Sequence, residues 1–210
     1  YMAKVSKALN YAIELGIIEK KPIIKFYKEG VGRIRSLTQD EEKGLIEFLK
    51  PLNRYYLDFC LFALDTGMRR GEILKMEYKN YHNGSVTIYE TKNNTNRTIP
   101  LTQRAQEILQ RNKSFKFKNH EMRSWWDRVK CYLNLQEDEE FVFHCLRHSC
   151  ASRLVRKKVP IQVVKDWLGH KSLSVTLRYA HLSQENLEEA RDALEQQTEV
   201  VTFPVTKRAY

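Results

Sequence analysis

The segment RYYLDFCLFALDTG, residues 54–67, restricts the possible folds of this chain more than any other. Its apolar residues occupy nearly every side of a helix, and such a helix is stable in water only when other elements surround it. Gly67 is the expected end of this helix, because glycine adopts the left-handed backbone conformation at little cost. The sequence therefore predicts a helical core built around residues 54–67.

Several other segments carry helical patterns with recognisable start and stop signals. Thr38 and Glu41 have the spacing of a capping box, which predicts a helix over LTQDEEKGLIEFL. A further helix is expected to begin near Arg69 or Arg70, and a later one to run from Pro160 to Gly169. The remaining helical patterns lie at residues 4–19, 101–110, 119–133 and 144–157, around Tyr179, and at 185–197 after Ser183.

The pattern changes to that of β-strands between residues 85 and 101. SVTIYET and RTIPL are rich in β-branched residues, and the polar segment KNNTN separates them. This arrangement predicts an antiparallel hairpin with a polar tip that carries Lys92. The expected fold class is therefore α+β, mainly helical with a small antiparallel β-sheet or hairpin.

Composition limits the classes of function. The 210 residues have a formal net charge of +10 and a hydrophobic content of 42%, which indicates a globular protein with an acidic partner such as nucleic acid. No apolar run approaches the length that spans a bilayer, and the first residues lack the pattern of a secretory signal. The scattered cysteines indicate packed thiols in a reducing compartment; they are Cys60, Cys131, Cys145 and Cys150.

Arg69 is the first candidate for chemistry. In TGMRRGEIL it follows Gly67, at a junction where one helix ends and the next begins. Backbone N–H groups at a helix start and a guanidinium suit a bound phosphate. The alternative is a surface ion pair of Arg69 or Arg70 with Glu72 or Asp65.

The segment HCLRHSC admits three interpretations. His144, Arg147 and His148 lie near one face of a helix, so an imidazole and a guanidinium there are placed to share a bound oxyanion. A packed histidine at a helix start is the ordinary alternative. A zinc site of His144, His148 and a cysteine is the third, although Cys145 and Cys150 point elsewhere on the helix.

Four segments together resemble the motifs of the tyrosine recombinase family, which comprises phage integrases and Xer-type recombinases. They are TGMRRGEIL, ETKNNTNRTIPL, HCLRHSCASRLV and DWLGHKSLSVTLRYAHL, and they cover roughly residues 36–182. The resemblance implies the family's catalytic-domain fold for residues 35–182. It further implies that residues 1–34 are the end of a core-binding domain with a basic linker. Residues 183–210 would be a C-terminal helix and tail of the kind that can be exchanged between protomers.

The resemblance also implies the roles of individual residues. Tyr179 would attack a DNA phosphodiester and form a 3′-phosphotyrosine. Arg69 and Arg147 would stabilise the charge of the transition state, and Lys92 would protonate the leaving 5′-oxygen. The complete implied set is Arg69, Lys92, His144 as the candidate base, Arg147, His170 as a phosphate contact and Tyr179, with Glu72 and His148 as supporting residues.

The implied activity is site-specific DNA recombination without metal, cofactor or ATP. The expected partners are double-stranded DNA and further copies of the chain, as a tetramer on synapsed DNA, with accessory DNA-bending proteins possible and no membrane. The expected location is the cytoplasm, of a bacterium or of a phage's host. A type IB topoisomerase has similar chemistry, and Xer-type dimer resolution remains open beside integration of a phage or mobile element. An architectural DNA-binding module and a zinc-dependent hydrolase are the alternatives from other classes.

Overall fold

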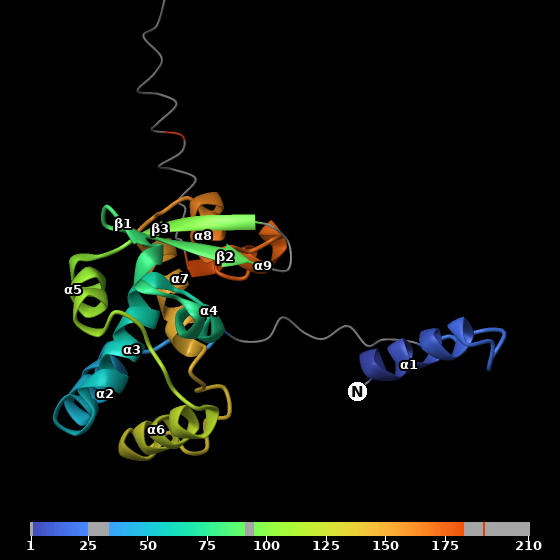
Figure 1. Ribbon diagram of the computed structural model, residues 1–210, viewed down its shortest axis with the longest axis horizontal. Helices are drawn as coiled ribbons and strands as arrows, with labels where there is room; N and C mark the ends of the chain where they lie inside the picture. The colour runs from blue at the N-terminus through green and yellow to red at the C-terminus, as the bar shows by residue number, and fades with distance from the viewer. Residues whose placement is uncertain (1, 25–33, 91–94, 183–190, 192–210) are drawn as a thin grey trace, which may run out of the picture. The chain divides into compact units, whose positions relative to one another are not determined.

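The computed structural model describes residues 2–24, 34–90, 95–182 and 191 (Figure 1). The chain divides into two compact units, Tyr1–Arg33 and Ile34–Tyr210. Within the first unit, helix α1 spans Met2–Glu14 and is followed by Gly16 at a φ of 69°. This left-handed glycine explains why the helix ends before residue 19, where the apolar pattern had predicted its end.

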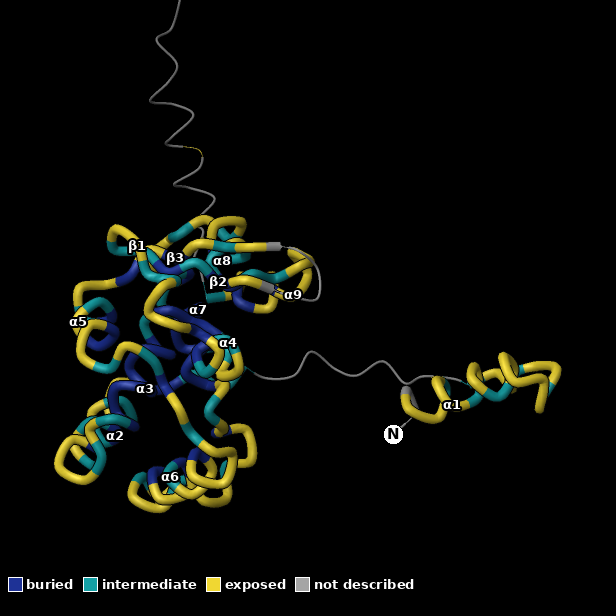
Figure 2. The backbone as a smooth tube through the Cα atoms, viewed as in Figure 1, coloured by how far each residue is buried: buried dark blue, intermediate teal, exposed yellow. Residues whose placement is uncertain are grey.

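The core of the second unit surrounds helix α3, Arg54–Thr66, as the sequence predicted. Phe59 and Phe62 of this helix are completely buried, and Gly67 ends it at a φ of 64°. Helix α3 packs against α2 (Gln39–Leu52), α5 (Gln103–Asn112) and α7 (Cys145–Arg156). Figure 2 shows the buried residues concentrated along α3 and α7. The predicted capping box also forms, because Thr38 Oγ1 accepts a bond from the Glu41 N–H at 3.1 Å.

A three-stranded antiparallel sheet follows α4 (Arg70–Lys75) and the 3₁₀ turn η1 (Tyr78–Asn80). Its strands are β1 (Tyr81–His82), β2 (Ser85–Glu90) and β3 (Thr95–Pro100), in that order. Strands β2 and β3 form the predicted hairpin, whose tip, residues 91–94 with Lys92, lies outside the described residues. Strand β1 was not predicted, although the Asn83-Gly84 pair that joins it to β2 is a recognised hairpin signal.

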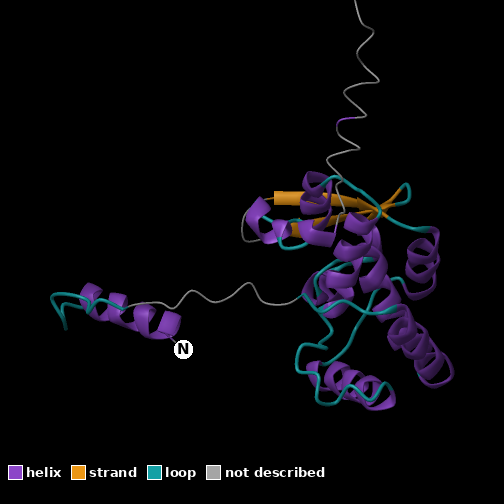
Figure 3. Cartoon of the chain, turned by 180° about the vertical axis from the view of Figure 1, so that it is seen from behind, coloured by secondary structure: helices purple, strands orange, loops and turns teal. Residues whose placement is uncertain are grey.

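The remaining helices lie at opposite ends of the second unit. Helices α8 (Ile161–Leu168) and α9 (Leu173–Leu177) lie beside the sheet, and α6 (Asn119–Tyr132) lies at the far end (Figures 1 and 3). Pro160 precedes α8 and Gly169 ends it at a φ of 66°, as predicted. The predicted fold class, mainly helical with a small antiparallel sheet, is confirmed.

The expected helix around Tyr179 is wrong in one respect. Helix α9 ends at Leu177 and the 3₁₀ turn η2 covers Ala180–Leu182, so Tyr179 lies in the turn between them. Its N–H donates to the Thr176 carbonyl, and its own carbonyl accepts from the Leu182 N–H, both at 2.9 Å. These contacts span three residues, which is too tight for a continuous α-helix. The predicted helix at 185–197 and its cap Ser183 lie outside the described residues.

Cys60, Cys145 and Cys150 are buried free thiols, whereas Cys131 is an exposed one, so the expectation of packed thiols holds for three of the four. In the part of the chain that the structure describes, no helix is both long enough and apolar enough to cross a membrane.

Candidate active site

Arg147 joins the ends of two helices at the centre of the site. Its side chain donates to the Gly67 carbonyl at 2.6 Å and to the Leu168 carbonyl at 2.7 Å. These carbonyls lie at the C-terminal ends of α3 and α8, where helical carbonyls lack partners within the helix and carry partial negative charge. Burial, with the nearby Arg69 charge, lowers the pKa of Arg147 to about 10, so the guanidinium stays charged at neutral pH.

Arg69 approaches the same end of α8 from another direction. It is the residue immediately before α4, and its Nη2 atom lies 3.4 Å from the Gly169 carbonyl oxygen. Arg147 binds the preceding carbonyl, that of Leu168. The two guanidiniums therefore converge on one short piece of backbone. The side chain of Arg69 remains 39% exposed, so it is accessible to a ligand.

Glu72 forms the ion pair that the sequence offered as an alternative for Arg69. Its Oε1 atom accepts from Arg69 Nη1 at 2.8 Å, and its Oε2 atom accepts from the Arg69 backbone N–H at 2.8 Å. Burial alone would raise the pKa of Glu72, but hydrogen bonds from Arg97 and Arg69 outweigh it and lower the pKa. Glu72 is therefore an ionised group that holds Arg69 in place.

Arg97, on β3, is a residue of this site that the sequence interpretation missed. Its Nη2 atom lies 2.6 Å from Glu72 Oε2, and its Nη1 atom lies 3.2 Å from Glu72 Oε1. The available signal was an arginine at the start of RTIPL, a segment predicted to be a strand. A charged residue there needs a partner when it is buried, and the strand pattern alone does not identify that partner.

His144 and His170 are both held as neutral imidazoles. Nδ1 of His170 lies 2.8 Å from Thr176 Oγ1, and burial together with the charges of Arg147 and Arg69 lowers the His170 pKa to about 4. His144 immediately precedes α7, and burial with the same two arginines lowers its pKa as well. A surface hollow of about 410 Å³ beside His144 gives a ligand access; its lining is Arg69, Arg70, Gly71, Val142, Phe143 and His144.

His148 contacts the hydroxyl of Tyr179. Nδ1 of His148 lies 2.6 Å from the Tyr179 hydroxyl oxygen, and the ring of His148 meets that of His144 edge-on at 4.8 Å. Burial raises the pKa of Tyr179 although Arg147 and Arg178 oppose this, and Tyr179 is only 2% exposed. The tyrosine hydroxyl is therefore close to the site but covered and protonated.

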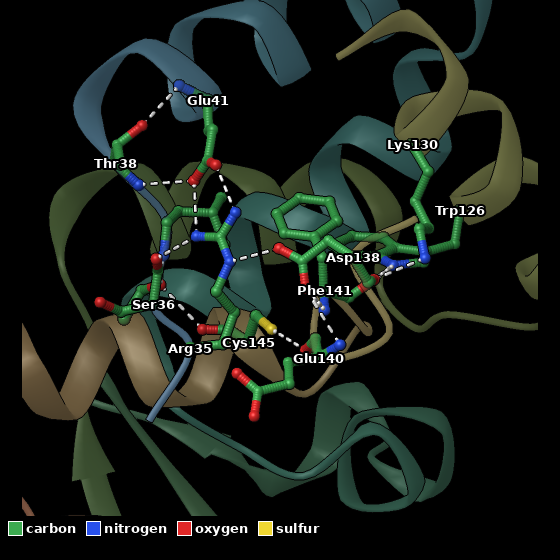
Figure 4. Close-up of polar contacts among 12 residues, drawn as sticks. Arg35, Ser36, Thr38, Glu41, Trp126, Lys130, Asp138, Glu140, Phe141 and Cys145 are labelled. Atoms are coloured by element: carbon green, nitrogen blue, oxygen red, sulfur yellow. Dashed lines mark hydrogen bonds and ion pairs between the residues drawn. The ribbon is translucent and has the colours of Figure 1, made fainter. Parts of the chain in front are cut away.

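The loop that leads to His144 is anchored by Arg35, as Figure 4 shows. Arg35 pairs with Glu41 of α2 and with Asp138 of the loop, whose Oδ2 atom lies 2.8 Å from Arg35 Nε. The guanidinium also lies over the ring of Phe141. The hydrogen bond from Arg35 lowers the pKa of Asp138. This network fixes the approach of the chain to α7 and thus to His144.

The structure thus brings five of the six predicted catalytic residues and both supporting residues into one region. The sixth, Lys92, lies outside the described residues, and the roles of all eight stay predictions. Among the described residues, no group of three His, Cys, Asp or Glu side chains is arranged to hold a metal ion. Two converging guanidiniums beside neutral imidazoles have the donor chemistry that suits an oxyanion such as a phosphodiester.

The sequence profile of the phage integrase family matches residues 35–186, which is more than half of the chain. This chain belongs to the phage integrase family. The resemblance to tyrosine recombinases that the four motifs indicated is thereby confirmed.

Relatives of this phage integrase family member include recombinases of bacteria and archaea. The chain is 30% identical to a shufflon-specific DNA recombinase of Escherichia coli over 95% of its own length and 54% of that protein. It is 30% identical to tyrosine recombinase XerA of Pyrococcus furiosus over 74% of its length and 60% of that protein. The chain spans about half the length of the first curated relatives it matches.

Solved structures agree with this family fold. The catalytic domain of bacteriophage HP1 integrase matches with a TM-score of 0.66 and 22% identity, over 85% of this chain and 100% of that one. The Tn1549 transposon integrase in complex with a circular intermediate DNA matches with a TM-score of 0.66 and 16% identity, over 91% of this chain and 76% of that one. At these identities the similarity establishes the fold.

Proposed function

We propose that this chain carries the catalytic centre of a site-specific DNA recombinase, which cleaves and rejoins strands through a 3′-phosphotyrosine. One observation carries the proposal: Arg69 and Arg147 converge on the Leu168–Gly169 backbone, with the hydroxyl of Tyr179 held by the histidine that follows Arg147. Family membership and the recombinase names of the relatives support it.

The proposed cleavage uses the arginines to stabilise charge. A phosphodiester gains negative charge on its non-bridging oxygens as the nucleophile approaches, and two guanidiniums can each offer paired donors to that charge. Arg69 is the accessible partner, whereas Arg147 is held deep in the site by two carbonyls. His170 adds a hydrogen bond to a phosphate oxygen in this proposal.

The nucleophile in the proposal is the phenolate of Tyr179. The covered hydroxyl first has to leave its contact with His148, because a DNA phosphate cannot reach a side chain that is 2% exposed. Its proton passes to His144, which the lowered pKa leaves neutral and able to accept it. The new P–O bond to Tyr179 forms as the bond to the 5′-oxygen breaks, and Lys92 supplies the proton that the leaving oxygen takes.

The proposed reaction requires neither ATP nor a metal ion. The phosphotyrosine bond conserves the energy of the broken phosphodiester, so the 5′-hydroxyl can attack it and restore the strand. Two arginines and a lysine supply the positive charge that a metal provides in other phosphoryl-transfer enzymes. Removal of divalent ions by a chelator is accordingly expected to leave strand cleavage unchanged.

The proposed partner is double-stranded DNA. In this proposal four copies of the chain bind two synapsed sites as a tetramer. The net charge of +10 supports binding to DNA, and affinity should fall steeply with salt because phosphate contacts dominate such binding.

We further propose that residues 1–34 are the end of a core-binding domain. The exposed apolar residues Tyr11 and Ile17 of the first unit support this proposal. Residues 183–210 are the proposed C-terminal tail, and the proposed setting is the cytoplasm, with integration of a phage or mobile element as the outcome.

The proposal is tested by trapping the covalent intermediate. Nicked duplexes tiled across the DNA flanking the element that encodes this chain are incubated with the protein, and adducts that survive denaturing electrophoresis are counted. Tyr179→Phe is expected to abolish the adduct, whereas Tyr78→Phe, an exposed tyrosine elsewhere in the second unit, is expected to retain it. If Tyr179→Phe forms the adduct undiminished, Tyr179 is not the nucleophile. If the unmodified chain forms an adduct on none of the fragments, the proposed function is contradicted.

A further inference from the structure

Arg97 contacts two separate parts of the site at once. Its forked guanidinium binds both carboxylate oxygens of Glu72, at 2.6 and 3.2 Å. Glu72 in turn holds the side chain and the backbone N–H of Arg69. The position of Arg69 therefore depends on a carboxylate that Arg97 orients from the opposite side.

The second contact of Arg97 is with the backbone immediately before His170. A methyl group built on Gly169 would lie only 2.7–2.8 Å from Arg97 Nη1, Cδ and Cζ, so the guanidinium packs directly against this glycine. Gly169 is also the residue whose carbonyl faces Arg69 Nη2. Arg97 thus supports the turn that carries both a carbonyl contact of Arg69 and the adjacent His170.

The location of Arg97 on the sheet adds a third connection. On β3 it stands opposite Ile88 of β2, and these two strands lead to the hairpin tip that carries Lys92. A single side chain therefore connects the hairpin, α4 through Glu72 and the end of α8 through Gly169.

The chemistry of this residue favours a positioning role over a purely stabilising one. The side chains of Arg97 and Glu72 are only 13% and 12% exposed, and the Nε atom of Arg97 is buried without a hydrogen-bond partner among the described residues. Burying an ion pair is weak evidence for stability, and an unsatisfied donor makes the burial less favourable still. A planar fork that spans both carboxylate oxygens, however, fixes the orientation of Glu72, which a lysine cannot do in the same way.

We propose that Arg97 is a positioning residue of the DNA cleavage site, which acts by holding Glu72 against Arg69 and by supporting the Gly169–His170 turn. It contacts no reacting atom in this role. The inference rests on the proposed function, because the groups that it positions are those assigned to phosphodiester cleavage.

The test compares Arg97→Gln and Arg97→Lys with the unmodified chain. A displacement of about 1 Å in a positioned group can lower a rate by about 100-fold, so we expect Arg97→Gln to slow single-turnover adduct formation by about that factor. DNA affinity is expected to change by less than about threefold, since most affinity comes from phosphate contacts elsewhere. Arg97→Lys is expected to recover part of the rate.

Glu72 supplies the readout that distinguishes positioning from stability alone. If Arg97 acts through Glu72, the double variant Arg97→Gln/Glu72→Gln cleaves little more slowly than Glu72→Gln, because residues in contact are not additive. Arg111→Gln is the matched control: it removes a bidentate pair with the buried Asp58, away from the site, and is expected to leave the rate unchanged.

The outcomes separate this inference from the proposed function. An unmodified chain that forms no adduct on any fragment overturns the proposed function. An unmodified chain that forms the adduct, with Arg97→Gln equally fast, overturns the positioning role alone. If Arg97→Gln fails to fold, Arg97→Lys is measured instead, at a temperature where that variant is fully folded. A normal cleavage rate of Arg97→Lys overturns the positioning role. A rate loss that simply adds to the loss caused by Glu72→Gln overturns it as well.

Discussion

The hydroxyl oxygen of Tyr179 lies 2.6 Å from Nδ1 of His148, inside a cluster where Tyr179 packs against Ala151, Val155 and Leu168. The pKa of His148 is lowered to about 4, first by burial and then by His144, Arg178 and Arg147, whereas the pKa of Tyr179 is raised above its usual value of 10.0. Transfer of the Tyr179 proton to His148 is therefore unfavourable, because burial weakens both the acid and the base. The contact holds a neutral hydroxyl in a resting position.

His148→Leu is expected to speed the first turnover. The change removes the hydrogen-bond partner and leaves a buried hydroxyl unsatisfied, which costs about 1–3 kcal/mol and weakens the resting position of Tyr179. Release of the hydroxyl then becomes more frequent, and the rate of adduct formation should rise by about fivefold or more. Single-turnover kinetics on a nicked duplex measure this rate, with His148→Leu/Tyr179→Phe as the inactive control. A slower rate in a fully folded His148→Leu protein would contradict the resting role of this contact.

The two arginines should differ in their contribution to stability. Arg147→Ala leaves the Gly67 and Leu168 carbonyls without these donors in a buried region, so the free energy of unfolding should fall by about 3 kcal/mol. Arg69 is 39% exposed, so Arg69→Ala should cost less than about 1 kcal/mol. Urea denaturation followed by circular dichroism measures both. Equal losses would mean that the carbonyl contacts of Arg147 add nothing to the fold.

Much of the fold was predictable because the signals were local. The capping box of Thr38 and Glu41, the helix ends at Gly67 and Gly169 and the helix start after Pro160 each depend on a few neighbouring residues. Backbone conformation and missing hydrogen bonds decide such positions, and both can be read from short stretches of sequence. The overlooked strand β1 was marked by Asn83-Gly84, a signal of the same kind.

The contacts within the site could not be predicted in the same way. Arg97 and Glu72 are 25 residues apart, and His148 and Tyr179 are 31 apart. Which way such side chains point depends on how β3, α4 and α7 pack, and packing involves the whole core. The motif order predicted Arg69, Arg147 and Tyr179 as site residues, but it gave no indication that Tyr179 is covered.

Gly169→Ala should disturb the site more than an equivalent change in another turn. Gly169 has a φ of 66° and a methyl group there would overlap Arg97, so both backbone strain and a steric clash are introduced. Gly84→Ala at a φ of 74° introduces the same kind of strain, but its nearest neighbour would be at an ordinary 3.5 Å. Each strain costs about 1 kcal/mol in unfolding free energy, and the clash adds to it only at Gly169.

The adduct rate separates the two glycine variants further. Gly169→Ala should lower the rate by about 10-fold or more, because it displaces the Arg97 guanidinium and the turn before His170. Gly84→Ala should cleave at the normal rate. Thermal unfolding and single-turnover kinetics on the same preparations provide both quantities, and equal rates for the two variants would contradict the importance of the Gly169 contact.

Stability should fall as the pH drops from about 6.5 towards 4, before most carboxylates are protonated. The pKa values of His148 and His170 are both lowered to about 4 in the folded chain, mainly by burial, against about 6.5 in an unfolded chain. Between these values the unfolded chain binds protons that the folded chain does not, so protonation favours unfolding. The stability that these neutral histidines contribute is fully present above about pH 6.5 and is lost as the pH falls towards 4. Urea midpoints measured across this range should decline. His148→Leu should flatten the decline, because it removes one of three histidines, with His144 and His170, whose pKa values are lowered. An unchanged slope in that variant would mean that His148 titrates normally in the folded state.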